Sequence, residues 1–150
     1  MNNYTRRSFI RNLLTDVYFI FDEIKGNDNL PLNKVRYLPD SVISNIRPVF
    51  FPECKIRVLN STLHKKTIVD KDWQMVKQLS DLELLAIQKF SNGQSLKETV
   101  EFCQAASNLD IESIFLEVKS FFLVLIEHRI CHPDKKYQLE DLNLESMNKR

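Results

Sequence analysis

The sequence predicts an α+β fold in which three short antiparallel strands are followed by three helices. Hydrophobic and polar residues alternate between residues 54 and 79, which is the period of β-strands. After residue 80 the hydrophobic residues recur at helical spacing, and two serine-based capping boxes mark helix starts. With 150 residues, of which 43% are hydrophobic, the chain is long enough for one domain with a buried core.

The first expected element is an amphipathic helix from Thr5 to Lys25, which Gly26 would end. Its start, residues 5–11 (TRRSFIR), resembles a twin-arginine export motif. However, acidic residues interrupt the hydrophobic stretch that follows, and no small-residue cleavage site is present there. We therefore expect a cytoplasmic protein. The hydrophobic stripe of this helix consists of Phe9, Leu13, Val17, Phe21 and Ile24, widened by Ile10, Leu14 and Ile20.

Residues 27–52 hold four of the five prolines, so we expect little regular structure there. One short helix is predicted from about Asp40 to Arg47, and the rest is expected to form a strap across the domain surface. Residues 1–52 then make up an N-terminal helix and strap, and residues 53–132 make up the main domain. Residues 133–150 hold few large hydrophobic groups and are expected to be a flexible tail.

Three strands are predicted in the first half of the main domain. Residues 54–58 alternate between hydrophobic and basic side chains, and residues 60–62 supply a turn. A second alternating run extends from Leu63 to Val69, so we interpret the two runs as a hairpin. The third strand is predicted from Trp73 to Leu79, where hydrophobic and polar residues again alternate.

Three helices are predicted in the second half. Ser80–Glu83 and Ser95–Glu98 are capping boxes that open the first two, and Asn92–Gly93 ends the first. The third helix starts after Asp110 and continues to about Arg129. Because its second half is hydrophobic nearly all round, we expect it to be central or partly covered by another chain.

Several functions are disfavoured by the composition. The longest hydrophobic run, Phe121 to Ile126, is far shorter than the roughly 18–20 residues that cross a bilayer. The net charge of +1 does not provide the global positive field of a nonspecific nucleic-acid binder. The sequence has no phosphate-binding loop and no hydrolase or metalloprotease motif, so we expect no enzyme and no cofactor.

Cysteine and histidine residues leave two chemical alternatives open. Cys54 and His64 would form a nucleophile–base pair only if the fold brought them together. A His-x-x-Cys-His run at residues 128–132 has donors that metals prefer, but Pro133 indicates that the helix is ending there. No second donor cluster accompanies this run in the sequence. We therefore expect no metal site.

The run from Leu79 to Ile87, followed by residues 90–100 with the turn Asn92-Gly93-Gln94-Ser95, resembles PqqD-like proteins. These proteins include the recognition elements of ribosomal-peptide maturation systems. The hydrophobic third helix completes the pattern, which covers about half of the chain, residues 54–132. The resemblance implies a winged-helix-like domain that binds a leader peptide and hands it to a modifying enzyme. Members of this group begin near the first strand, whereas about fifty residues precede it here.

Such a peptide would add as a strand to an open sheet edge and place side chains in a groove between that edge and a helix. Residues 53–79 carry six basic and three acidic residues, whereas residues 80–131 carry four basic and eight acidic ones. A basic edge would attract an acidic peptide. The candidate binding residues are Lys55, Arg57, Lys65, Lys66, Trp73, Phe115 and Phe122.

Each candidate has an alternative interpretation. Charged residues on an edge strand also prevent aggregation, and aromatic residues also pack in cores. The chain could instead be a structural accessory subunit of a larger complex, or form a homodimer, through its third helix and its N-terminal helix. A DNA-binding regulator is less consistent with the sequence, because Leu96–Ala106, the helix that would enter the major groove, is net negative. We therefore expect a precursor peptide and a modifying enzyme as partners, and no nucleic acid.

Overall fold

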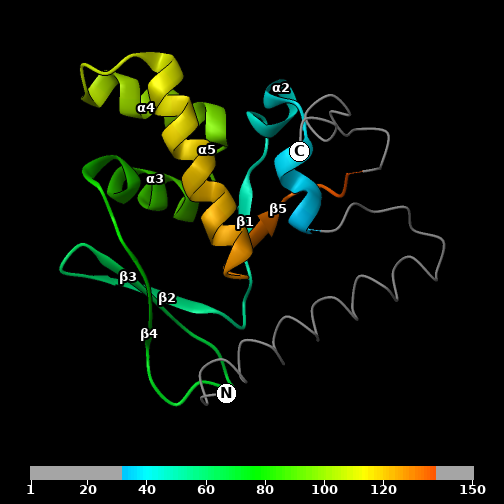
Figure 1. Cartoon of the computed structure of the whole chain (residues 1–150), viewed down its shortest axis with the longest axis vertical. Coiled ribbons are helices and arrows are strands. Elements are labelled where there is room, and N and C mark those ends of the chain that lie inside the picture. The colour runs from blue at the N-terminus through cyan, green and yellow to red at the C-terminus, as the bar shows by residue number, and fades with distance from the viewer. Residues whose placement is uncertain (1–31, 138–150) are drawn as a thin grey trace.

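The computed structural model describes residues 32–137 and has an α+β fold with a small antiparallel sheet and several helices (Figure 1). The expected N-terminal helix and residues 138–150 lie outside this range. The helical elements are the 3₁₀-helix η1 (Leu32–Tyr37) and the α-helices α2 (Asp40–Ile43), α3 (Asp81–Ser91), α4 (Leu96–Ala106) and α5 (Ile111–Glu127). The strands are β1 (Pro48–Phe50), β2 (Lys55–Leu59), β3 (Thr62–Lys66), β4 (Gln74–Gln78) and β5 (Cys131–Pro133).

Strands β2, β3 and β4 form an antiparallel sheet with β3 in the centre. The hairpin turns at Asn60 and Ser61, whose φ angles are 52° and 61°. Positive φ at both central residues is typical of a type I′ turn, whose twist matches that of the flanking strands. A β-bulge after Leu63 interrupts the β3–β4 register. The predicted hairpin and third strand are confirmed, although the second strand ends at Lys66 and not at Val69.

Both predicted capping boxes are present. The Ser80 hydroxyl accepts a hydrogen bond from the Glu83 N–H (3.2 Å), and the Glu83 carboxylate accepts one from the Ser80 N–H (2.9 Å). Ser95 and Glu98 repeat this exchange at the start of α4, with distances of 3.1 and 3.2 Å. These reciprocal bonds satisfy backbone N–H groups that have no partner within the helix.

The proline-rich segment differs from the expected surface strap. Its hydrophobic side chains are buried with those of the helices, and its predicted helix ends at Ile43 instead of Arg47. Backbone hydrogen bonds from the Leu96 and Lys97 N–H groups to the Ile46 and Ser44 carbonyls join the segment to the start of α4. The buried side chains are Leu32, Val35, Leu38, Ile43 and Ile46.

A second, two-stranded sheet joins this segment to the end of the main domain. Strand β1 pairs antiparallel with β5, with Pro48 opposite Pro133. Neither strand was expected, because prolines rarely occur inside sheets and the partners are more than 80 residues apart. Each proline lies at the end of its strand. Arg129, with φ 58°, reverses the chain between α5 and β5.

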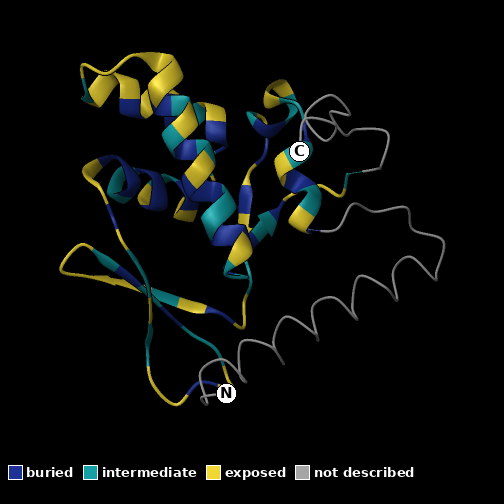
Figure 2. Ribbon diagram, in the orientation of Figure 1, coloured by how far each residue is buried: buried dark blue, intermediate teal, exposed yellow. Residues whose placement is uncertain are grey.

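Helix α5 lies at the centre of the described fold, as its sequence predicted. It contacts α3, α4, η1 and β5. Phe90 of α3 stacks on Phe121 and meets Phe122 edge-on, with ring centroids 6.3 Å apart in both pairs. Figure 2 shows buried residues along α3 and α5, whereas exposed residues are frequent along the β2–β3 hairpin. Among the described residues, no helix has both the length and the hydrophobicity needed to cross a membrane.

Truncation of a central aromatic residue tests this packing. Phe122 has no exposed surface, so Phe122→Ala leaves a cavity that the surrounding helices fill only in part. We predict that it lowers the free energy of unfolding by about 3–5 kcal/mol in urea denaturation. Met75→Ala, at a site that is 66% exposed, serves as the control and changes stability by about 0.5 kcal/mol or less. Equal changes in the free energy of unfolding of the two variants would contradict the burial of Phe122 in the core.

The caps of α4 and α5 predict a pH dependence of stability. Hydrogen bonds from the Ser113 side chain and the Glu112 N–H lower the pKa of Asp110. Hydrogen bonds with Ser95 lower the pKa of Glu98. Carboxylates with a lowered folded-state pKa stabilise the fold above their unfolded pKa, and this stabilisation is lost as the pH falls through the folded value.

The double variant Asp110→Asn, Glu98→Gln removes both titrating groups while keeping side chains that can accept hydrogen bonds. We predict that its stability falls less steeply than that of the wild type between about pH 5 and pH 2. Urea denaturation at a series of pH values measures this slope. Parallel pH profiles of the two proteins would show that the caps do not contribute.

Candidate functional site

The outward face of the three-stranded sheet brings together four of the predicted binding residues. Lys55 lies opposite Lys66, and Arg57 lies opposite His64, which in turn lies opposite Met75. Directly opposite residues share one face of a sheet, so these side chains form a row across it. We call Lys55, Arg57, Lys66, Trp73 and Met75 the outward sheet face. Lys55, Arg57 and Met75 are exposed, and Lys66 and Trp73 are half-buried.

A cation–π contact orders part of this face. The Arg57 guanidinium lies 4.5 Å from the centre of the Trp73 ring. Arg57 belongs to β2 and Trp73 precedes β4, so the contact reaches across the central strand. A contact of this kind at an exposed site contributes about 0.5–1 kcal/mol. It holds an aromatic ring and a positive charge together on a surface open to solvent.

Lys65 does not belong to the outward sheet face. Only 5% of its surface is exposed, and its ammonium group donates a hydrogen bond of 2.7 Å to the His128 carbonyl at the end of α5. Neighbouring residues of a strand point to opposite faces, so Lys65 and Lys66 cannot both face outward. Lys65 therefore anchors the sheet to α5.

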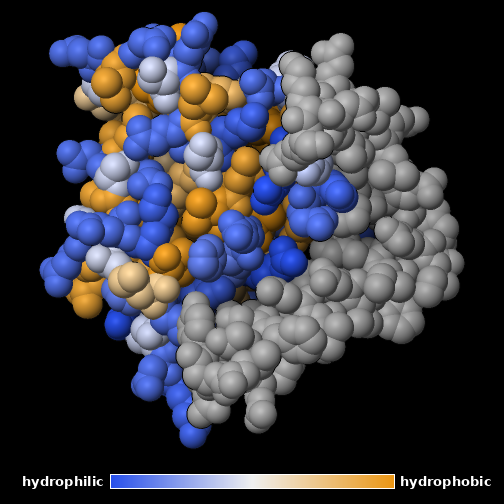
Figure 3. Space-filling model, in the orientation of Figure 1, coloured by the Kyte–Doolittle hydropathy of each residue, from blue (hydrophilic) through white to orange (hydrophobic). Residues whose placement is uncertain are grey.

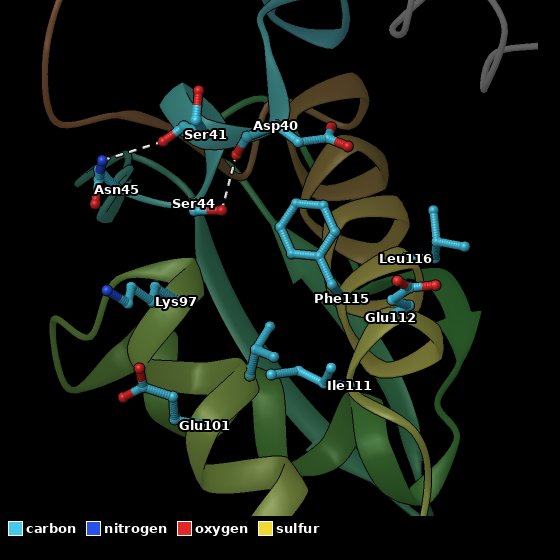
Figure 4. A pocket seen from close by; sticks show the side chains of 11 residues that line it. Asp40, Ser41, Ser44, Asn45, Lys97, Glu101, Ile111, Glu112, Phe115 and Leu116 are labelled. Atoms are coloured by element: carbon cyan, nitrogen blue, oxygen red, sulfur yellow. Dashed lines mark hydrogen bonds between the residues drawn. The ribbon is translucent and has the colours of Figure 1, made fainter.

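The two predicted phenylalanines lie away from the sheet face. Phe122 is completely buried in the core, where it offers no surface to a peptide. Phe115 is half-buried and lines a groove between α2, α4 and α5, into which its ring points (Figure 4). The fold thus separates the seven candidates into an outward sheet face, a buried anchor, a core residue and a groove residue.

Both outer strands of the sheet, β2 and β4, leave one edge without a strand partner among residues 32–137. The side chains of β2 alternate across its two faces. Lys55 and Arg57 point outward, whereas Ile56 and Val58 lie on the face of Leu63, which is fully buried. Ile56 packs against the core, and Val58 is 42% exposed. The β2 edge therefore presents a basic side and a hydrophobic side.

The β4 edge is tied to the helices by polar contacts. The Lys77 ammonium forms an ion pair with the buried Glu83 carboxylate of the α3 capping box. It also lies 5.9 Å from the centre of the Phe121 ring. The Ser80 hydroxyl is within 2.7 Å of the Glu117 carboxylate on α5. These contacts hold the sheet to the helices and occupy charged groups next to β4.

The loop between β3 and β4 displays hydrophobic side chains that the sequence analysis did not single out. Ile68 and Val69 are 91% and 54% exposed. The loop is held by the buried Asp70, which accepts hydrogen bonds from the Thr67 N–H and hydroxyl and from the Gln74 amide, at 2.9–3.0 Å. The spacing of Thr67 and Asp70, which lets the aspartate bond back to the N–H of a residue three positions earlier, is the local sequence signal for this loop. The hydrophobic surface of the sheet thus extends beyond its strands.

The groove between α2, α4 and α5 was not predicted either. It has a volume of about 720 Å³, within the range of ligand pockets in proteins. Hydrophobic residues gather over α5 between hydrophilic ones in Figure 3. Ile111 and Leu116 at the groove are 46% and 59% exposed. The lining residues are Asp40, Ser41, Ser44, Asn45, Lys97, Val100, Glu101, Ile111, Glu112, Phe115 and Leu116.

The described residues assemble neither the nucleophile–base pair nor the metal site that the sequence left open as alternatives. Cys54 is buried in the core, whereas His64 lies in the row of the outward sheet face, so the two lie on different sides of the sheet. Burial and the nearby Cys54 raise the pKa of Cys131, which disfavours its thiolate. The His132 ring packs against Phe51 with centroids 4.7 Å apart. Among residues 32–137, no cluster of three potential metal ligands is present.

Comparison with protein-family models, with curated proteins and with solved structures finds no match to this chain. The interpretation of its surfaces therefore depends on their own geometry and charge.

Trp73 is the sole tryptophan of the chain, so tryptophan fluorescence reports on the outward sheet face. Arg57→Ala removes the group that covers the Trp73 ring, so we predict a shift of tryptophan emission to longer wavelength. The free energy of unfolding should fall by only about 0.5–1 kcal/mol, because the site is exposed. Lys71→Ala in the neighbouring loop is the control and should leave the emission unchanged. A red shift of equal size in both variants would contradict the stacking.

Proposed function

We propose that this protein binds an extended peptide or protein segment by strand addition at the β2 edge and presents it to a modifying enzyme. The observation that carries the proposal is the two-sided β2 edge described above. An added strand supplies affinity through backbone hydrogen bonds, and its alternating side chains supply specificity. No strand among residues 32–137 pairs with the outer side of β2, and an added strand would form its backbone hydrogen bonds there.

The side chains of β2 define the peptide that would fit. Residues opposite each other on neighbouring strands have Cβ atoms about 4.5–5.5 Å apart. Outward-facing residues of an added strand would therefore lie beside Lys55 and Arg57, and inward-facing ones beside Ile56 and Val58. The complementary ligand alternates acidic and aliphatic residues. Arg57, with Trp73 behind it, offers a partly fixed positive charge to such a ligand.

The order of elements supports the same proposal. Strands β2, β3 and β4 are followed by α3, α4 and α5, the order that the resemblance to PqqD-like proteins implies for a winged-helix-like domain. In that interpretation the chain is a recognition element without chemistry of its own, and a separate enzyme modifies the bound peptide. If the charges on the edge strand served only to prevent aggregation, no such peptide would bind there.

The proposal is tested with a fluorescently labelled synthetic peptide of alternating glutamate and leucine, using anisotropy to measure its dissociation constant. The double variant Lys55→Glu, Arg57→Glu replaces two positive side chains with negative ones. At these two positions the glutamates of the peptide are then repelled instead of attracted. We predict that the dissociation constant rises about tenfold or more, equal to about 1.4 kcal/mol. The difference from the wild type should shrink at high salt, because exposed charges are screened.

The control variant is Arg36→Glu, Lys135→Glu, which makes the same change in net charge at two exposed positions outside the sheet. Its affinity for the peptide should stay close to that of the wild type. A second peptide, in which lysine replaces glutamate, should bind the wild type more weakly than the first. If both double variants bind the acidic peptide as the wild type does, strand addition at the basic β2 edge is wrong.

A further inference from the structure

The groove between α2, α4 and α5 lies at the opposite end of the described fold from the three-stranded sheet (Figure 1). Hydrophobic side chains from α4 and α5 line it, and Figure 4 shows the Phe115 ring and Ile111 between the helices that border it. Ile111 and Leu116 are about half exposed, although α5 is otherwise the central helix of the core. A partner that covered them would remove hydrophobic surface from water.

The charged residues around the groove are mainly acidic. Glu101 of α4 and Glu112 of α5 are exposed, and neither has an ion-pair partner among residues 32–137. Asp40 of α2 is paired with Lys119 at 2.7 Å. Lys97 is the one basic residue in the groove lining. The occupant should therefore combine a hydrophobic stripe with basic side chains.

We propose that the occupant is the chain's own N-terminal segment, Thr5–Lys25, docked as an amphipathic helix. The first half of this segment carries Arg6, Arg7 and Arg11 and no acidic residue before Asp16. Phe9, Leu13 and Val17 recur at a spacing of four, which is how a helix presents anchors to a groove. Ile10 and Leu14 widen this stripe, and Arg7 and Arg11 precede them by three residues. On a helix the two arginines therefore lie one turn apart along the widened side of the stripe, where they can face the acidic rim.

The connecting residues are long enough for docking within one chain. Residues 26–31 join the segment to η1 and span up to about 20 Å when extended. Helix η1, about 12 Å long, leads toward Asp40 at the groove. A helix over residues 5–25 adds about 30 Å. The basic half of the segment can therefore reach the groove of its own chain.

Hydrogen exchange of the full-length protein, followed by mass spectrometry, tests this docking. A helix of about 20 residues is marginally stable alone in water, so slow exchange within residues 9–21 requires a docking surface. We expect these amides to be protected in the wild type. The variant Ile111→Ser, Leu116→Ser should accelerate their exchange about tenfold or more while α3 stays protected. The matched control, Leu59→Ser, Met75→Ser, makes the same kind of change on the sheet and should have no effect on residues 9–21.

Exchanging the charges of the groove and of the N-terminal segment tests whether this segment is the occupant of the groove. Glu101→Lys, Glu112→Lys and, separately, Arg7→Glu, Arg11→Glu should each weaken the protection of residues 9–21, and their combination should restore it. Protection should not depend on protein concentration. Absence of protection in the wild type, protection that survives the groove variants, or protection that is lost on dilution would each overturn docking of this segment within its own chain. These outcomes are independent of whether the acidic peptide binds the β2 edge.

Discussion

The burial of α5 is the constraint on which the rest of the fold depends. Helices α3, α4 and η1 and strand β5 all contact it, and its aromatic residues pack against Phe90. Because the second half of α5 is hydrophobic on nearly every side, no single layer could cover it. The proline-rich segment supplies the missing cover through η1, and the β1–β5 pair fixes that segment to the chain beyond α5. The segment thus belongs to the core.

The sheet is joined to this helical core by polar anchors as well as by buried hydrophobic residues such as Leu63. Lys65 reaches the carbonyl end of α5, and Lys77 pairs with Glu83, which also closes the α3 capping box. Glu98 repeats this double role at α4, where Arg47 pairs with it at 2.7 Å. Each capping glutamate therefore joins a helix start to a chain segment outside the helix. The sheet is attached to the described helices through one face, and four of the seven candidate binding residues gather on its other face.

The elements that sequence predicted correctly are those specified by neighbouring residues. Alternation, capping boxes and helical spacing are local patterns, and they located β2, β3 and β4 and all three long helices. Strand β1 was missed because its partner β5 is remote in sequence. The grouping of Lys65 with Lys66 overlooked strand geometry, since Lys65 shares the face of Leu63. Phe115 and Phe122 look alike in sequence, and only the packing of α2 and α3 around α5 separates a groove residue from a core residue.

The charge separation between the two ends of the domain relates the two proposals. The strand region is net basic and the helical region net acidic, although the whole chain is nearly neutral. An arginine-rich N-terminal segment would meet like charges at Lys55 and Arg57 and opposite charges at Glu101 and Glu112. Electrostatics therefore favours the groove over the β2 edge as the proposed docking site of this segment. Under the two proposals, the N-terminal segment would add to the helical side of the fold and leave the β2 edge to an acidic peptide.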